Sequence, residues 1–505
     1  MWTVALITFS FVIVIFFIFT RNKKPHPPLP PGPSSLPVFG NLLSLQPDLH
    51  SYFASLAQIH GPLFSLRLGS KLAVVISSPA VAAGVLRDND AIFANRDVPA
   101  AALAATYGGA DIVWTPLGPE LRLLRKVCVR EMLGPATLAA LYGLRRREVR
   151  HAVKQIAGRV GTPVRVGEEM FLVAMNIITG MLWGGTVAEA AERETIGREF
   201  RATVAELTEL LGTPNLSDFF PALGKLDLQG VVRKMKKVAK RFDDVFERVI
   251  EKRLRINDKD EKIERDFLEV LLKMKDEYER NGGENGVSFT MIHIKALLMD
   301  MVVGGTDTTS NTVEFAMAEI MNKPEVLNKV QEELDTVIGK DGVVEEHHIY
   351  KLPYLQAVMK ETLRLHPTVP LLVPHCPSES CIVGGYTIPK GSRVFFNVWA
   401  IHRDPSIWAN PLEFDPNRFV NAKFDFNGND FTYFPFGSGR RICAGIGMAE
   451  RMVFFSLASL LHSFDWKWPA GEERNVEEKF GIVLSKKIPL VLIPEPRLTD
   501  PALYE

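Results

Sequence analysis

The chain has 505 residues, 47% of them hydrophobic, and it carries 59 Lys or Arg residues against 59 Asp or Glu residues. This length allows a large buried core. The zero net charge excludes the strongly basic field that non-specific nucleic-acid binding requires, so no nucleic-acid partner is expected. The cysteines, Cys128, Cys376, Cys381 and Cys443, are too sparse for a disulfide framework and indicate a reducing compartment.

The N-terminus has the features of a retained membrane anchor. Residues 2–20, WTVALITFSFVIVIFFIFT, carry no charge and approach the roughly 20 residues that cross a bilayer. Arg21, Lys23 and Lys24 follow this run, which argues against a cleaved signal peptide and keeps the rest of the chain cytosolic. We therefore expect a transmembrane signal anchor at residues 1–20, a basic and proline-rich hinge at 21–33, and one large domain at 34–505.

Helical patterns outnumber strand patterns along the rest of the chain. Residues 63–77 alternate around a Gly-Ser pair and predict a β-hairpin, and short strands return at residues 384–399. A helix near residues 234–249 has one apolar and one basic face, for which a solvated face is a simpler explanation than membrane contact. Residues 255–266 and 281–286 read as exposed loops. The balance predicts a mainly α fold with small β-sheets.

A helical pattern over residues 290–322 contains an unusual centre, GGTDTT, at residues 304–309. Each glycine costs a helix up to about 1 kcal/mol relative to alanine, so packing alone would not select this run. Two interpretations stay open. Either the helix stops and restarts, or the glycines open it so that a flat ligand approaches the backbone. In the second case Asp307 and Thr308 supply a carboxyl and a hydroxyl that can relay protons to a bound oxygen species.

The loop FGSGRRICAG, residues 436–445, presents the lone Cys443 among glycines and after two arginines. Glycines let backbone amides turn toward the sulfur, and cationic neighbours favour a thiolate. Such a thiolate fits a haem iron. Three other interpretations compete with this one. A phosphate loop would need a further glycine or a Lys-Ser/Thr pair, and a nucleophilic cysteine would need a base that the sequence does not place. A lone cysteine is also most often buried and inert.

The loop matches the pattern F-x-x-G-x-R-x-C-x-G through Phe436, Gly439, Arg441, Cys443 and Gly445. With this pattern the sequence resembles the cytochromes P-450, the haem-thiolate monooxygenases, of the membrane-bound plant type. GGTDTT, ETLRLHP (residues 361–367) and FDPNRF (residues 414–419) resemble further family motifs in the expected order. The resemblance extends from the N-terminal anchor to the last strand, and it implies the P-450 fold, a single large haem domain and haem b as cofactor.

The resemblance also implies roles for individual residues. Cys443 is expected to be the iron ligand, in a cofactor-binding loop shaped by Phe436, Gly439 and Arg441. Asp307 and Thr308 correspond to the family's catalytic acid–alcohol pair. The family's buried structural ion pairs correspond to Glu361, Arg364 and Arg418.

Two departures from the family pattern concern the residues expected to bind the haem propionates. Leu121 stands where the family often has a tryptophan four residues before Arg125, so one propionate hydrogen bond is expected to be missing while Arg125 is kept. His375 stands where relatives commonly carry arginine and is expected to donate to a propionate.

Apolar segments indicate the substrate pocket. Residues 99–116 resemble the loop that covers the family's pocket, and the expected lining residues are Gly304, Val369, Leu371 and Ile482. Apolar walls predict a small hydrophobic substrate. The helix around GGTDTT resembles those of both flavonoid and terpenoid hydroxylases, so both substrate classes stay open.

The implied reaction inserts one oxygen atom from dioxygen into this substrate. Electrons are expected to come from NADPH through a cytochrome P-450 reductase, because the chain has no dinucleotide or flavin motif. The implied location is the endoplasmic reticulum membrane, single-pass, with the domain facing the cytosol. Two rivals are a same-fold isomerase or dehydratase that needs no dioxygen and a membrane-anchored haem protein without turnover; the retained Asp307 and Thr308 count against both.

Overall fold

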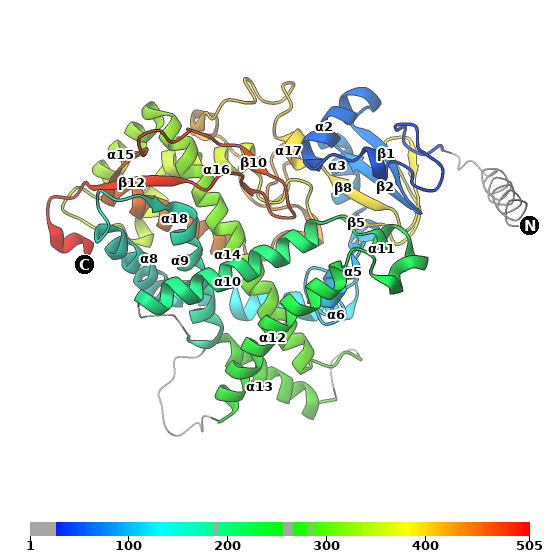
Figure 1. The fold of residues 1–505 in the computed structure, drawn as a ribbon, viewed down its shortest axis with the longest axis horizontal. Helices are drawn as coiled ribbons and strands as arrows, with labels where there is room; N and C mark the ends of the chain where they lie inside the picture. Colours follow the sequence, from blue (N-terminus) through cyan, green and yellow to red (C-terminus); the bar gives the residue numbers. More distant parts are fainter. Residues whose placement is uncertain (1–26, 186–189, 256–265, 283–285) are drawn as a thin grey trace, which may run out of the picture.

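The computed structural model describes residues 27–185, 190–255, 266–282 and 286–505. The expected anchor at residues 1–20 and most of the expected loop at 255–266 lie outside these residues. Helices form most of the described chain; one group of strands lies near the N-terminal end, and a further strand lies toward the C-terminus (Figure 1). The prediction of a mainly α fold with small β-sheets is therefore confirmed.

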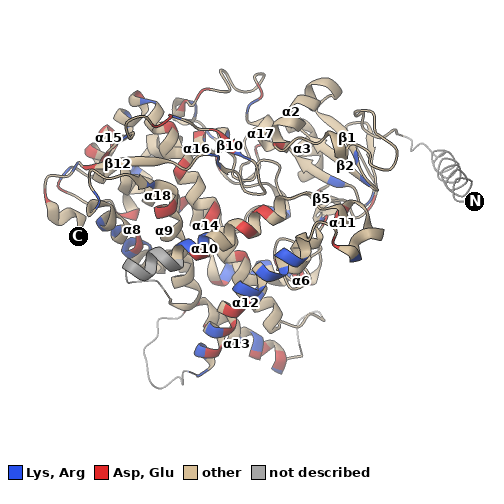
Figure 2. Ribbon diagram, viewed as in Figure 1, with Lys and Arg blue, Asp and Glu red and all other residues tan. Residues whose placement is uncertain are grey.

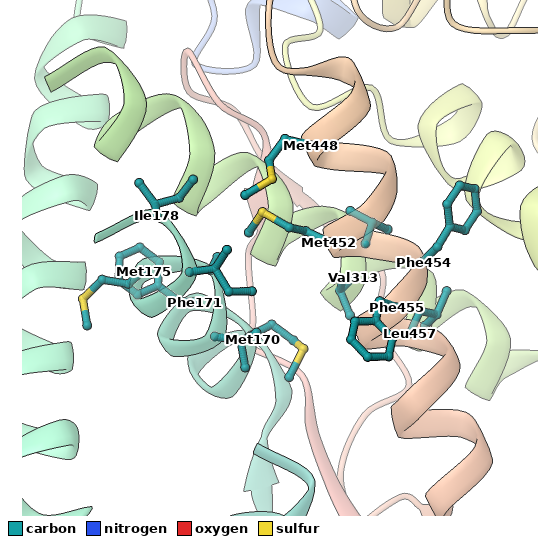
Figure 3. Packing of buried hydrophobic residues seen from close by; sticks show 14 of the residues in the cluster. Met170, Phe171, Met175, Ile178, Val313, Met448, Met452, Phe454, Phe455 and Leu457 are labelled. Carbon is teal, nitrogen blue, oxygen red and sulfur yellow. The ribbon is translucent and has the colours of Figure 1, made fainter. Parts of the chain in front are cut away.

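The core is built around α14 (Met291–Asn322), which packs against α9 (Val166–Trp183) and α18 (Ile446–Ser463). Every residue of α14 from Thr309 to Met321 is buried. Figure 3 shows how α9 and α18 fill the space beside α14 with methionine and phenylalanine side chains, among them Met170, Phe171, Met452 and Phe455. A helix buried on all sides is the rigid centre of a large domain, so α14 can hold site residues in fixed positions.

The GGTDTT run does not interrupt α14. The hydroxyls of Thr306, Thr308 and Thr312 each donate to the carbonyl four residues earlier, at 2.8, 2.7 and 2.7 Å. These bonds satisfy the hydroxyls inside a continuous helix. The interpretation that the helix stops and restarts is therefore wrong.

The remaining helices surround this core: α2 (Leu49–His60), α3 (Pro79–Leu86), α4 (Asp90–Phe93), α5 (Ala100–Ala105), α6 (Pro119–Val127), α7 (Pro135–Ala140), α8 (Tyr142–Ala157), α10 (Ala190–Gly212), α11 (Leu216–Phe219), α12 (Val231–Arg255), α13 (Phe267–Arg280), α15 (Pro324–Val337), α16 (Pro353–Leu365) and α17 (Val398–Ile401). Among the described residues, α9 alone is long and apolar enough to cross a membrane, and 72% of it is buried, as expected of a core helix.

The largest sheet has the order β1-β2-β8-β5-β3. The predicted hairpin is confirmed as β1 (Leu63–Leu68) and β2 (Lys71–Ile76), and β8 (Arg393–Phe396) runs parallel to β2. The short strands β3 (Asn95–Arg96) and β5 (His375–Cys376) pair so that Arg96 lies directly opposite His375. The sheet thus brings together two basic residues that are far apart in the sequence.

In the part of the chain that the structure describes, three smaller sheets accompany the largest one. They pair β4 (Val164–Arg165) and β9 (Phe464–Lys467) with β12 (Val491–Pro496), β6 (Cys381–Val383) with β7 (Tyr386–Ile388), and β10 (Glu478–Lys479) with β11 (Ser485–Lys486). The described end of the proline-rich hinge packs on two of the sheets. Ser65 of β1 donates to Pro30 and Pro31, and the Thr387 hydroxyl of β7 donates to Pro27.

Candidate active site

Cys443 lies between a short 3₁₀ helix, Gly439–Arg441, and the start of α18. Its backbone N–H donates to the Phe436 carbonyl at 3.0 Å, and the Gly445 N–H points at its Sγ at 3.3 Å. The Cys443 side chain is accessible even though protein surrounds it, because its exposed surface faces an internal cavity. Burial raises the pKa of the Cys443 thiol, and the Gly445 amide and the Arg125 charge oppose this only in part. Burial in this loop therefore disfavours the thiolate, and a bound haem iron would supply the positive charge that favours it.

The turn before Cys443 requires glycine at position 439. Gly439 has a φ of +65°. A Cβ there would lie 2.6 Å from Asp90 Oδ1 and 2.9 Å from the Leu86 carbonyl. A side chain would push the loop away from α3 and α4, so Gly439 shapes the loop without lining the cavity.

The cavity beside Cys443 has a volume of about 320 Å³. Gly304, Gly305 and Thr308 of α14 line this cavity together with Phe436 and Cys443 of the cysteine loop. A Cβ built on Gly304 would have no neighbour within 4 Å, so the helix backbone is open to the cavity at that point. A flat ligand can therefore lie between the α14 backbone and the cysteine.

A cluster of basic side chains lines this cavity. Arg96, Arg125, Arg441 and His375 all line it. They are held by backbone carbonyls: Arg441 donates to Ala94 at 2.6 Å and Thr115 at 2.5 Å, Arg125 to Ile442 at 2.9 Å, and Arg96 to Val373 at 2.5 Å. Burial, followed by the neighbouring cations, lowers the pKa of Arg96, and burial lowers the pKa of Arg441 to about 10. Such a cluster needs anionic partners.

Arg96 was not predicted from the sequence. Its Nε is buried without a hydrogen-bond partner, so it has a donor left for an anion in the cavity. Its pairing with His375 across the β3–β5 ladder could not be read from one sequence, because 279 positions separate the two residues.

His375 was expected to donate a hydrogen bond to a haem propionate, but its ring is not arranged as a free donor. Its Nδ1 lies 2.8 Å from the Phe93 carbonyl, which can only accept, so Nδ1 carries the proton. Burial and the charge of Arg96 lower the pKa of His375 well below its usual value. The neutral ring presents a lone pair at Nε2, and His375 donates to an anion only when it is protonated. Leu121 is buried in α6, and it does not line the cavity.

The predicted acid–alcohol pair points in two directions. Thr308 lines the cavity, whereas the carboxylate of Asp307 accepts a hydrogen bond from Thr208 of α10 at 3.5 Å. Burial raises the pKa of Asp307, against the opposing charge of Arg201. The structure thus places Thr308 at the cavity and turns the Asp307 carboxylate toward α10.

The expected substrate-pocket residues divide between two cavities. Gly304 and Val369 line the cysteine cavity. Leu371 and Ile482 line a neighbouring cavity of about 100 Å³, and Leu372 lines both.

Glu361, Arg364 and Arg418 come together as predicted. The Arg364 guanidinium donates to both Glu361 oxygens, at 2.6 and 2.8 Å, and both side chains are fully buried. Arg418 donates to Glu361 at 3.2 Å. Arg364 also donates to the carbonyls of His402 and Pro411 at 2.8 and 2.7 Å. Every member has hydrogen-bond partners, which a buried ion pair requires, and the cluster ties α16 to the segment that leads to the cysteine loop.

The residues around the cavity fit haem b. The cysteine sulfur can ligate iron, the open backbone at Gly304 admits a flat macrocycle, and the cationic rim matches two propionates. Among the described residues there is no cluster of three or more His, Cys, Asp or Glu side chains that would hold a metal ion directly.

Comparisons with known proteins agree with this fit. The cytochrome P450 family model matches residues 30–493. The chain is 42% identical to a flavonoid 3'-monooxygenase of Crocosmia x crocosmiiflora over 99% of both chains, and 40% identical to one of Petunia hybrida over 97% of both. It is 38% identical to cytochrome P450 76T24 of Catharanthus roseus, covering 95% of this chain and 96% of that one.

A solved structure shows the same fold. A zebrafish cytochrome P450 with progesterone superposes with a TM-score of 0.74 at 24% identity, covering 90% of this chain and 100% of the other. The chain therefore belongs to the cytochrome P450 family, and it is a haem-dependent monooxygenase that uses dioxygen and a small organic substrate.

Proposed function

We propose that this monooxygenase hydroxylates a flavonoid. The observation that carries the proposal is a single cavity that Thr308, Cys443 and an apolar wall line together. The wall is formed by Ile178, Met181, Met301, Leu363 and Val369. Such walls select a small ring system mainly by shape. They would also admit a terpenoid, but several of the most similar relatives are named flavonoid 3'-monooxygenases, which favours the flavonoid.

Cys443 is the proposed iron ligand, and Arg96, Arg125 and Arg441 are the proposed partners of the haem propionates; His375 joins them only when it is protonated. When bound, haem supplies the iron centre that activates dioxygen and transfers one oxygen atom to the substrate. Thr308 holds a hydroxyl at the cavity wall through its 2.7 Å bond to Gly304, so it can pass on a proton there. Asp307 supplies a carboxyl that faces α10 and can take up protons from that direction.

A reductase that uses NADPH is the proposed electron donor. Exposed Arg122, Lys126 and Arg130 lie on and just after α6, the helix that also carries Arg125. Arg125 in turn contacts Ile442 in the cysteine loop. This positive surface near Cys443 would attract an acidic partner and orient it for electron transfer.

The proposed location is the endoplasmic reticulum membrane, with a single N-terminal span and the domain in the cytosol. An apolar patch supports this orientation. It consists of the exposed residues Leu36, Val38, Phe39, Leu43, Leu223, Leu226 and Leu228. Phe39 packs edge-on against Phe220 at 6.2 Å, which brings the two segments together. A large exposed apolar patch marks an interaction surface, and this patch is continuous with the chain that leads to the expected anchor. Figure 2 shows Lys and Arg positions along α12, the helix that follows the second segment of this patch in the chain.

The test is an incubation of membranes that carry the protein and a plant reductase with NADPH and a panel of flavonoids and terpenoids. We expect a flavonoid product heavier by one oxygen atom that depends on NADPH. The Cys443→Ala variant is the control and should give no such product. A product of unchanged mass formed without NADPH would instead indicate an isomerase, and oxidation of terpenoids alone would overturn the flavonoid proposal.

A further inference from the structure

Two carboxyl groups meet between the loop of residues 99–116 and α14. Asp111 is fully buried, and its Oδ1 accepts a hydrogen bond from the Trp114 N–H at 2.7 Å. Its Oδ2 is buried and receives no N–H or hydroxyl donor. The side chain of Asp300, which lines the haem cavity from α14, contacts the Asp111 side chain, and it also accepts a hydrogen bond from the N–H of the next residue, Ile112, at 2.9 Å. Because an ionised carboxylate can only accept, the contact between the two carboxyl groups is a hydrogen bond only when one of them carries a proton.

The surroundings favour a protonated pair. Burial, and then the charge of Asp111, raises the pKa of Asp300 well above its usual value. Burial raises the pKa of Asp111 to about 6, against the opposing charge of Arg441. Besides Asp300, the charged groups that face Asp111 are Arg441 and Arg96. Besides Asp111, the titratable group that faces Asp300 is the buried thiol of Cys128.

Asp300, together with Arg441, holds the backbone at Ile112, the residue next to Asp111. The Ile112 N–H donates to Asp300 Oδ2 at 2.9 Å, and the Ile112 carbonyl accepts from Arg441 Nη1 at 3.1 Å. Ile112 and Val113 form part of the cavity wall. If both carboxyl groups are ionised, their repulsion acts directly on the residue next to this wall.

We propose that Asp111 and Asp300 are positioning residues that share one proton and thereby hold the loop of residues 99–116 against α14 over the cavity. Loss of the proton at alkaline pH separates the carboxyl groups and loosens the loop. The loop is also held elsewhere, by the hydrogen bond from the Tyr107 hydroxyl to Asp243 of α12 at 2.8 Å. That second contact does not depend on a shared proton, because the hydrogen bond with Lys295 helps to keep the pKa of Asp243 below its usual value even though burial acts to raise it.

The test uses the haem-loaded full chain without substrate, so its outcome does not depend on the flavonoid proposal. Hydrogen exchange of the peptide that contains Ile112 is measured at pH 6.5 and 9.5 and corrected for the intrinsic rate. Carbon monoxide is the probe of access to the cavity, because it carries no charge, and its recombination rate is measured after a light flash at both pH values.

In the wild type we expect protection of the Ile112 peptide to fall at least tenfold from pH 6.5 to 9.5 and carbon monoxide recombination to become faster. Asp300→Asn should remove both pH dependences and keep the protection. Its amide donates to Asp111, its oxygen accepts from Ile112, and neither group titrates. Asp300→Leu should lower the protection at both pH values.

Asp243→Asn is the matched control. It weakens the other contact of the loop and should leave the pH dependence at Ile112 as it is in the wild type. The proposal is overturned if either wild-type readout is the same at both pH values. It is also overturned if Asp300→Asn retains the wild-type pH dependence.

Discussion

Asp307 and Thr308 are adjacent in α14, but their side chains point in different directions. Thr308 faces the cavity and donates to Gly304 at 2.7 Å, whereas Asp307 accepts a hydrogen bond from Thr208 of α10 at 3.5 Å. A proton that passes between them has to cross the helix surface from the α10 side to the cavity. This geometry gives the two residues separable roles, so their substitutions should differ.

Thr308→Ala should uncouple NADPH consumption from hydroxylation. A positioned proton-transfer group contributes about 10²–10⁴-fold, so we expect the product formed per NADPH to fall by about 10²-fold. Product by mass and NADPH by absorbance are measured together. Thr306→Ala is the matched control: Thr306 makes the same kind of bond, 2.8 Å to Val302, but it does not line the cavity. Unchanged coupling in Thr308→Ala would contradict the role given to its hydroxyl.

Asp307→Asn should lower coupling while it raises stability. Burial raises the folded-state pKa of Asp307, so the folded protein holds a proton on this carboxyl more tightly than the unfolded chain does. Such a group contributes stability at low pH and costs stability once the pH exceeds the unfolded value of 3.8. At neutral pH the neutral amide removes that cost, and the thermal midpoint should rise. A lower midpoint together with unchanged coupling would show that Asp307 is only structural.

The sequence predicted those parts of the site that lie in one continuous stretch. The cysteine loop, GGTDTT, and the Glu361 and Arg364 pair each sit within a few residues, where helix and turn geometry decides what the side chains can reach. Arg96 and the Asp111–Asp300 contact depend on distant segments meeting, which no local pattern shows. Leu371 shows another reason why the sequence did not predict the whole site, namely a local turn in the backbone. The next residue, Leu372, has a φ of +49° and turns back to Val369, so the segment does not present all its side chains to one cavity.

Glu361→Gln should strongly destabilise the fold. Glu361 and Arg364 are both fully buried, and removing one partner leaves an uncompensated charge, which costs about 3–5 kcal/mol. The measurement is denaturant unfolding of the holoprotein, together with haem content from its absorbance. Glu495→Gln is the control, because the Glu495–Lys467 pair is 43% and 61% exposed, and such exposed pairs contribute at most about 1 kcal/mol. An equal loss of unfolding free energy in the two variants would contradict the structural role of Glu361.

The cluster around His366 should make stability depend on pH. His366 lies 2.8 Å from Glu319 and 2.6 Å from Glu478. Burial alone would lower the pKa of His366, but the two carboxylates outweigh it and raise the pKa above 6.5. Its contribution is therefore fully present below pH 6.5 and is lost as the pH rises through the higher folded value. Burial acts to raise the pKa of Glu478, but His366, His50 and Arg403 together lower it, so its contribution is present above pH 4.5.

The window of greatest stabilisation by this cluster is thus between pH 4.5 and 6.5. We expect the difference in thermal midpoint between the wild type and His366→Gln to be largest near pH 6 and to shrink toward pH 9. His347→Gln, at an exposed histidine, should show no such trend. A midpoint difference for His366→Gln that grows with pH would mean that His366 is neutral in the folded protein.

Gly439→Ala should impair haem binding through the shape of the cysteine loop. Gly439 combines a φ of +65° with little free space, because a Cβ added there would lie 2.6 Å from Asp90 and 2.9 Å from Leu86. Gly471→Ala separates the effect of the left-handed backbone from the effect of steric contact. Gly471 has a φ of +83°, but a Cβ added to it would have nothing within 4 Å. The left-handed conformation costs a residue with a side chain about 1–2 kcal/mol, and both variants should show that loss. Only Gly439→Ala should also displace the loop and lower the fraction of protein that gives a thiolate-haem absorbance with carbon monoxide. Equal haem content in the two variants would mean that Asp90 and Leu86 yield without moving Cys443.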